Sequence, residues 1–242
     1  MKKLICAAAM SALCATVFAI ESENIVGYQQ ITVGTGYHLF TVTFGEVGNT
    51  DGTFNINGIK VYQNGEEYAT NNRVSLQKMD ETGAYLTTYN YRKSKGGWCQ
   101  LATFKTDVTV KNGEAVCINN TTGADIQLQV SGAVNLDPWS GTLPTGYSLC
   151  GNMTPSTINL NDVVPYQDNE VYATNNRVSL QKMDETGTYL TTYNYRKSKG
   201  GWCQLATLKT DITLEPGESF CVNNTTGAPI QLKFKSPIST AE

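Results

Sequence analysis

The sequence has little of what catalysis commonly uses. It contains one histidine, His38, and charged residues make up only 16% of its 242 positions. No Cys-x-x-Cys pair, phosphate-binding glycine loop or complete calcium loop occurs in it. A histidine-dependent triad or a conventional zinc site could therefore exist once at most. We interpret His38 as a half-buried strand residue, and we expect no metal and no cofactor.

Long apolar runs are also lacking, except at the start. Residues 4–18 are almost entirely apolar and follow the basic segment Met1-Lys2-Lys3. Val17-Phe18-Ala19 places small residues where a signal peptidase cuts, so the sequence predicts a signal peptide over residues 1–19. The run is shorter than the roughly 20 residues of a membrane span, and we expect no span in the mature chain. We expect export from a bacterial cell, to the periplasm, the cell surface or the extracellular space.

Positive charge is scarce as well. Removal of the signal peptide leaves 16 basic and 21 acidic side chains, a net charge of −5. Nucleic-acid binding depends on neutralising phosphates with Lys and Arg. The mature composition therefore argues against a nucleic-acid partner.

What the sequence does have is an internal repeat. Residues 68–103 recur at 172–207 with one difference, Ala84 against Thr188. Such a repeat predicts two copies of one structural unit, which we place at 20–132 and 133–242. No low-complexity linker separates them, so we expect the two units to pack closely.

The pattern within each unit is typical of β structure. Short runs rich in Val, Ile, Thr and Tyr alternate with Gly, Asn and Asp at hairpin spacing. Residues 73–79 and 85–92 predict a hairpin across the turn ending at Gly83. The predicted fold is all-β, with two tandem repeats of a β-sandwich or barrel-like unit.

Short motifs add a resemblance. They are Val26-Gly27-Tyr28, Gly36-Tyr37-x-Leu39 with Gly146-Tyr147-x-Leu149, Gly97-Trp98 with Gly201-Trp202, and Pro216-Gly217-Glu218-Ser219-Phe220-x-Val222-Asn223. In these the chain resembles a group of uncharacterised exported bacterial β-repeat proteins, although unit 1 has Asn112 in place of the proline. The resemblance implies secretion and a β fold, and it carries no activity.

Five cysteines remain after signal removal. Cys99 and Cys117 occupy the same places in the first unit as Cys203 and Cys221 in the second. In an exported protein this spacing is compatible with one disulfide per unit, Cys99–Cys117 and Cys203–Cys221, or with buried apolar thiols. We expect Cys150 to be a free buried thiol.

The richest constellation of side chains is an aromatic and basic one. With a period of two, Tyr85, Tyr89 and Tyr91 would share one strand face, beside the Arg92-Lys93 loop. Such a face can stack on sugar rings or seat a protein partner. We expect Trp98 and Trp202 in the core, and Tyr89, Tyr91 and Arg92 at least half exposed. The full set of candidate binding residues is Tyr85, Tyr89, Tyr91, Arg92, Lys93, Tyr189, Tyr193, Tyr195, Arg196 and Lys197.

Three functions follow, in order of preference. The first is a secreted, non-catalytic structural or adhesive protein of the cell envelope or extracellular space, which would self-assemble or contact an envelope protein. The second is a carbohydrate-binding module with one glycan site per unit. The third is a glycoside-acting enzyme using paired carboxylates, which we do not expect because the duplicated acids all lie in or beside predicted turns.

Overall fold

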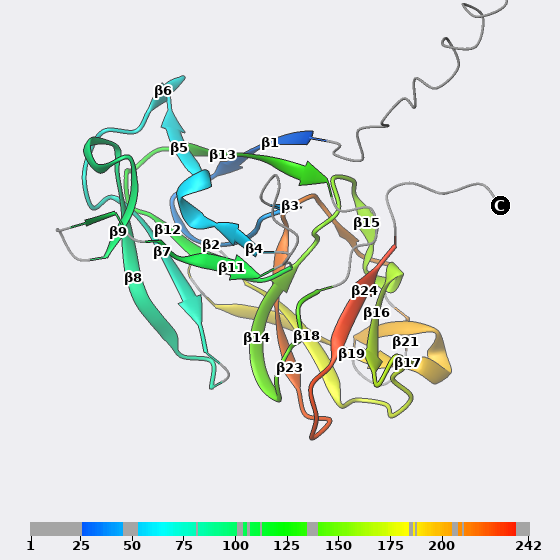
Figure 1. The fold of residues 1–242 in the computed structure, drawn as a ribbon. Helices are drawn as coiled ribbons and strands as arrows, with labels where there is room; N and C mark the ends of the chain where they lie inside the picture. The colour runs from blue at the N-terminus through cyan, green and yellow to red at the C-terminus, as the bar shows by residue number, and fades with distance from the viewer. Residues whose placement is uncertain are drawn as a thin grey trace, which may run out of the picture.

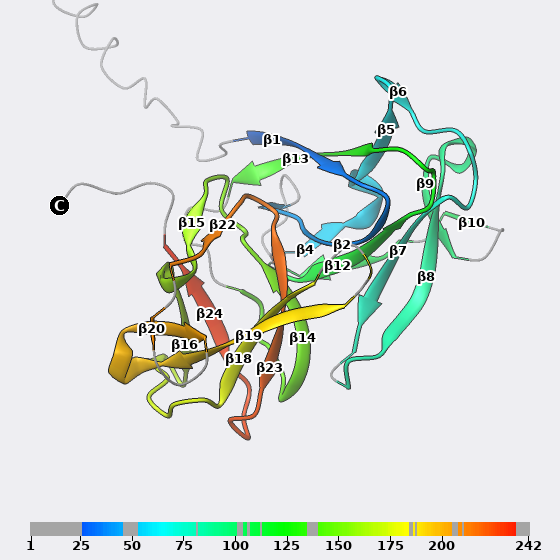
Figure 2. The same ribbon diagram turned by 180° about the vertical axis from the view of Figure 1, so that it is seen from behind.

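The protein folds as an all-β structure (Figures 1 and 2). The computed structural model describes residues 26–45, 53–80, 82–100, 104–105, 107–111, 113–134, 140–183, 186, 188–204, 208–209 and 211–235. The predicted signal peptide and most of the 45–52 loop lie outside these ranges. In this part of the chain no helix is long and apolar enough to cross a membrane. Its only helical elements are four 3-10 turns, η1 (Ile56–Gly58), η2 (Lys93–Lys95), η3 (Leu160–Asp162) and η4 (Lys197–Lys199).

Unit 1, the described residues from 26 to 134, is built on two antiparallel sheets and a short ribbon. The larger sheet has the spatial order β10 (Phe104–Lys105), β9 (Gly97–Gln100), β8 (Tyr85–Arg92), β7 (Val74–Met79), β12 (Ala115–Asn120) and β2 (Gly36–Thr41). The second has the order β1 (Val26–Val33), β13 (Ile126–Val134), β5 (Lys60–Gln63) and β6 (Glu66–Glu67), with β3 (Phe44–Gly45) also paired to β13. The ribbon joins β11 (Thr109–Lys111) to β4 (Thr53–Asn55).

Unit 2, the described residues from 140 to 235, has the same strand order. Its larger sheet runs β21 (Leu208–Lys209), β20 (Gly201–Gln204), β19 (Tyr189–Arg196), β18 (Val178–Met183), β23 (Ser219–Asn224) and β14 (Gly146–Gly151). The other strands are β24 (Gln231–Phe234), β16 (Val163–Gln167) and β17 (Glu170–Val171), with the ribbon β15 (Ile158–Asn159) and β22 (Thr213–Leu214). The place of β1 is taken by residues 140–143, which bond to β24 and to Ile230 just before it. The two units lie side by side in both ribbon views.

Each unit has a core of its own between its two sheets. In unit 1, Leu76 of the larger sheet packs in the same buried cluster as Leu128 of the second sheet. In unit 2, the equivalent residues Leu180 and Leu232 share a second cluster. Neither of these two clusters includes a residue of the other unit. The hydrophobic contribution to stability is therefore largely internal to each unit.

A tryptophan is fixed in each core, as the sequence predicts. Trp98 is fully buried, and its indole N–H donates to the Ile59 carbonyl at 3.0 Å while its backbone N–H donates to Asn57 Oδ1 at 2.9 Å. Trp202 is held in the same way, with its backbone N–H on Asn161 Oδ1 at 2.9 Å. An indole N–H buried without an acceptor would be destabilising, so these bonds let the ring occupy the core.

The predicted hairpin is confirmed. Strands β7 and β8 pair across the turn, where Gly83 has a φ of +87° that favours glycine. His38 lies half-buried in β2, as expected. The predicted boundary at 132/133 falls within β13, which continues to Val134.

Of the two alternatives for the repeated cysteines, the disulfides are wrong and the buried thiols are confirmed. All five described cysteines are buried free thiols, which confirms Cys150 as free but not the pairs Cys99–Cys117 and Cys203–Cys221. The reason is strand order, since β7 and β8 lie between the strands that carry Cys99 and Cys117. Three strand spacings amount to about 14 Å, twice the roughly 7 Å Cα separation that a disulfide tolerates. The same two-strand separation holds in unit 2.

Candidate functional site

The tyrosines of β8 do not share one face, contrary to the sequence prediction. Gln77 pairs with Thr88, but Met79 pairs with Tyr85, so β8 carries one extra residue between these two pairs. Such a bulge reverses the direction of every side chain beyond it. Tyr89 therefore faces the core of unit 1, whereas Tyr85 points from the opposite face of the sheet. The same register shift occurs in β19 of unit 2.

Tyr91 and Tyr195 are core residues, which corrects the prediction that Tyr91 is at least half exposed. Their exposed fractions are 1% and 5%, and each ring meets its tryptophan edge to face, at 5.3 and 5.4 Å between centroids. The Tyr91 hydroxyl donates to Glu67 Oε1 at 2.5 Å. Burial, and then this carboxylate, raise the pKa of Tyr91. Neither ring is available for stacking on a sugar.

The remaining candidates lie at the rim of the core. Tyr89 and Tyr193 are half-buried and pack against their own cores. Arg92 and Arg196 are also half-buried, and an Arg92 amino group donates to Asn72 Oδ1 at 2.8 Å. The prediction that Tyr89 and Arg92 are at least half exposed is therefore wrong as well, because each is less than half exposed. Lys93 and Lys197 lie in the exposed turns η2 and η4, where each ammonium contacts a backbone carbonyl of the neighbouring hairpin. The ten predicted residues thus form no single surface.

Tyr85 and Tyr189 instead meet where the two units join. The Tyr85 hydroxyl donates to Met183 Sδ at 3.4 Å, and the Tyr189 hydroxyl reaches Met79 Sδ at 4.0 Å. These two contacts are reciprocal, because Met79 and Tyr85 of unit 1 correspond to Met183 and Tyr189 of unit 2. The tyrosines of the repeated block are therefore used in joining the units.

The thiols of Cys117 and Cys221 lie next to the hydroxyls of Tyr85 and Tyr189. Burial raises the pKa of Cys117 and of Cys221 to about 11, an effect partly offset by hydrogen bonds to Tyr85 and Tyr189 respectively. Burial also raises the pKa of both tyrosines, and the hydrogen bond to Tyr85 raises that of Tyr189 further. Both thiols therefore remain protonated, and so weakly nucleophilic, at neutral pH.

The backbone contacts between the units are reciprocal too. Thr41 N–H donates to the Gly217 carbonyl at 3.0 Å, and Gly151 N–H, its equivalent, donates to the Gly113 carbonyl at 3.3 Å. We call this whole contact surface the seam. Its residues are Leu39–Thr41, Met79, Tyr85 and Gly113–Cys117 of unit 1, with Leu149–Gly151, Met183, Tyr189 and Gly217–Cys221 of unit 2.

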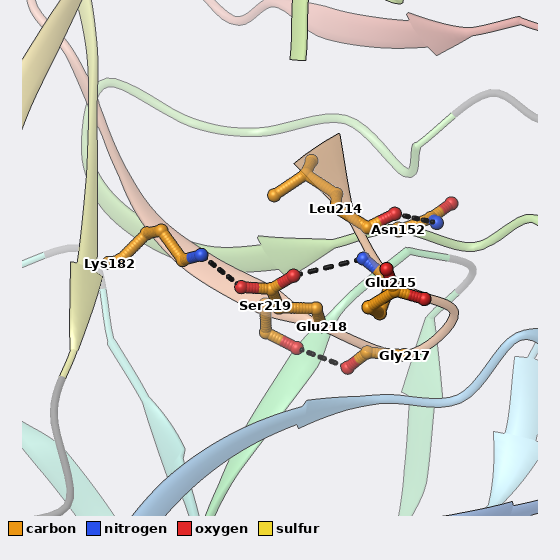
Figure 3. A network of polar contacts seen from close by, with 7 residues as sticks. All are labelled: Asn152, Lys182, Leu214, Glu215, Gly217, Glu218 and Ser219. Atoms are coloured by element: carbon orange, nitrogen blue, oxygen red, sulfur yellow. Dashed lines mark hydrogen bonds and ion pairs between the residues drawn. The ribbon is translucent and has the colours of Figure 1, made fainter. Parts of the chain in front are cut away.

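Each of the two turns that reach across the seam is stabilised by a glutamate carboxylate of its own. In unit 2, Glu218 accepts a hydrogen bond from the Glu215 backbone at 2.9 Å and forms an ion pair with Lys182 (Figure 3). Glu114 makes the same bond and pairs with Lys78 at 2.8 Å. These contacts hold the turns that carry Gly217 and Gly113, whose carbonyls accept the hydrogen bonds from the other unit.

A pocket opens beside the seam. It has a volume of about 260 Å³, and both units line it. Its apolar side includes Met79, Leu86, Pro144 and Tyr147, and its polar side includes Lys78, Asp80 and Glu114. Tyr147 and Leu86 are 38% and 48% exposed, so both side chains are accessible from the pocket. The equivalent residues Tyr37 and Leu190 are 37% and 49% exposed.

The two carboxylates of the pocket are already engaged in hydrogen bonds or an ion pair. Asp80 accepts hydrogen bonds from the Thr82 hydroxyl and from the Ala84 backbone N–H, which lower its pKa. Glu114 is held by Lys78. Within the described ranges there is no group of three or more His, Cys, Asp or Glu side chains able to hold a metal ion.

Comparison with known proteins gives no relative. No protein-family model, no curated protein and no solved structure matches the chain. Thr41, Gly151 and Tyr147 are not among the site residues predicted from the sequence. For Thr41 and Gly151 the only available signal is that the copies differ there, which by itself does not distinguish an interface from a drifting loop.

Proposed function

We propose that the chain is a secreted, non-catalytic protein with a structural or adhesive role in the cell envelope or extracellular space. The observation that carries this proposal is that the aromatic side chains of the repeated block serve packing and the contact between the units. Tyr91 and Trp98 pack one core, and Tyr85 joins the units, with the same arrangement in unit 2. Near-identity of the two copies is then accounted for by folding and pairing, without a catalytic requirement.

The proposed architecture is two sandwich-like β units that follow a cleaved signal peptide. The location of each core between two sheets supports the sandwich description. The basic start, the short apolar run and Val17-Phe18-Ala19 support export. Asp80 of the pocket is poorly suited to act as a general acid, because such a group needs a raised pKa whereas the pKa of Asp80 is lowered by its hydrogen bonds from Thr82 and Ala84.

Expression of the full gene in a bacterial host tests this proposal. We expect the protein in the periplasmic, envelope or culture fraction, with Ile20 or a nearby residue at its N-terminus. We further expect it to sediment with the envelope or as assemblies, and to release no sugar from polysaccharides. Material in the cytoplasm that still begins at Met1 would contradict the proposal.

A second candidate function is carbohydrate binding at the seam pocket. The observation in its favour is Tyr147, an exposed aromatic ring beside polar groups, which is the chemistry that sugars require. Its counterpart Tyr37 offers a second ring on the same chain. Two such sites would strengthen binding to a polymer.

A glycan array tests this candidate. Binding to a polysaccharide should fall at least ten-fold in Tyr147→Ala, and further when Tyr37→Ala is added. Tyr28→Ala is the matched control, because Tyr28 is 61% exposed but does not line the pocket. An equal loss in the control, or no glycan bound by the parent protein, would eliminate this candidate.

A further inference from the structure

Equivalent residues of the two units touch one another at the centre of the seam. Thr41 and Gly151 occupy the same position in their units, and a Cβ placed on Gly151 would lie 2.3 Å from Thr41 Oγ1. A contact between counterparts places both of them next to the rotation axis that relates the units, and reciprocal contacts make that axis a two-fold. The reciprocal hydrogen bonds of Thr41 and Gly151, and those of Tyr85 and Tyr189, agree with this axis.

The side chains next to the axis break its symmetry. Thr41 Oγ1 lies 2.7 Å from Ser219 Oγ, and both atoms are buried. Unit 1 has Ala115 where unit 2 has Ser219, and unit 2 has Gly151 where unit 1 has Thr41. Unit 1 therefore supplies the Thr41 hydroxyl at the axis. Unit 2 leaves room for it at Gly151 and supplies Ser219 as its hydrogen-bond partner.

This difference discriminates between pairs of units. A pair of two first units would place a threonine where Gly151 lies, and a Cβ at that point is far too close to Thr41 Oγ1. A pair of two second units would lose the threonine hydroxyl and leave a gap at the axis. Only unlike units fill the space without a clash and give the Thr41 hydroxyl its partner Ser219, which is specificity by complementarity combined with steric exclusion.

We propose that the seam is a selective docking surface whose partner is an unlike unit, in the same chain or in a second copy of this chain. Each unit has its own core, so a unit can dock without unfolding. Chains that exchange units form the same seam contacts as a single chain, at the cost mainly of association entropy. Exchange therefore increases with protein concentration, against an effective concentration within one chain in the millimolar range. This inference rests on the seam and is independent of the proposed function.

Cysteine cross-linking between two full-length chains tests the proposal. One chain carries Thr41→Cys and the other, with a mass tag, carries Ser219→Cys. The two are unfolded together under reducing conditions, refolded at increasing protein concentration, and oxidised with glutathione disulfide. We expect a disulfide-linked mixed dimer on non-reducing gels and by intact mass, with a yield that rises with concentration.

Four control proteins make every outcome informative. Thr41→Cys alone and Ser219→Cys alone should each give at least ten-fold less dimer, because like units do not pair. A single chain with both substitutions should become 2 Da lighter, and if it does not, the seam geometry itself is wrong. The parent protein, with its native thiols, sets the background. Absence of the mixed dimer while the double variant cross-links, or equal yields from like and unlike pairs, would overturn the proposal.

Discussion

At the scale of single residues, the two nearly identical blocks have different surroundings. Tyr91 and Tyr195 occupy the same position in the two cores, but the Tyr91 hydroxyl donates to Glu67. The residue equivalent to Glu67 in unit 2 is Val171, which has no side-chain acceptor. A comparison of the two tyrosines within this one chain therefore measures what a single, partly buried hydrogen bond contributes to stability.

Removing the Tyr91 hydroxyl should cost more than removing that of Tyr195. We expect Tyr91→Phe to lower the free energy of unfolding by about 1.5–3 kcal/mol, as for a hydrogen bond to a charged group, and Tyr195→Phe by under about 1 kcal/mol. Urea denaturation of the two variants measures the difference. In a Glu67→Val background the cost of Tyr91→Phe should fall to that of Tyr195→Phe, and an unchanged cost would contradict this account.

The buried thiols predict a loss of stability in alkali. Burial raises the pKa of Cys150 to about 12, and those of Cys117 and Cys221 to about 11, from an ordinary value of 9. The unfolded chain releases these protons first, so stability is at its full value below pH 9 and falls as the pH rises towards 11 and 12. The slope is at most about 1.4 kcal/mol per thiol per pH unit.

Guanidinium unfolding at pH 8, 9, 10 and 11 measures this decline. It should be smaller in a Cys117→Ala/Cys221→Ala variant than in the parent. At pH 8 all five thiols of the mature chain should react with a thiol reagent only after unfolding. Fewer than five reactive thiols in the unfolded, unreduced protein would reveal a disulfide and contradict the structure.

At the scale of strands and turns, the sequence predicts most of what is local. The β7–β8 hairpin, the glycine turns and the buried tryptophans follow from turn chemistry and apolar pattern. The sequence does not predict the bulge in β8, because the residues between Tyr85 and Tyr89 give no indication of an extra unpaired residue. Strict alternation then assigns Tyr85 to the wrong face. The predicted disulfides are wrong for a related reason. The spacing of two cysteines along the chain does not show that two other strands lie between the strands that carry them.

The bulge can be tested by energetic coupling. Tyr85 contacts Met183 of the other unit, so a double-mutant cycle between Tyr85→Ala and Met183→Ala should give a coupling of about 0.5–1 kcal/mol. Tyr89→Ala is the matched control, because Tyr89 packs on its own core and should be additive with Met183→Ala within about 0.5 kcal/mol. Equal coupling for the two tyrosines would mean that they share a face after all.

At the scale of the whole molecule, the units are separately stabilised. Among the described residues the two cores contain nineteen and sixteen buried side chains, whereas the cluster at the seam contains three. Apolar burial contributes about 25 cal/mol per Å², so the seam contributes far less than either core. The two units should therefore unfold in separate steps.

Calorimetry of two equivalent core variants examines this. Leu76 and Leu180 are both fully buried, and each change to alanine should cost its own unit about 2–5 kcal/mol. Leu76→Ala should lower the temperature of one transition and Leu180→Ala that of the other. A single transition that both variants lower equally would show that the seam couples the units into one cooperative whole.

The hydrogen bonds of Thr41 and Gly151 have a consequence for fragments of this protein. Strands β2 and β14 are the last strands of the two larger sheets, and at these residues each is covered by a turn of the other unit. A half-length product, from proteolysis or a shortened gene, would expose that strand edge to water. Bare edges recruit strands from other molecules. We therefore expect either half to be aggregation-prone when expressed alone, so that the two copies are retained together in one gene.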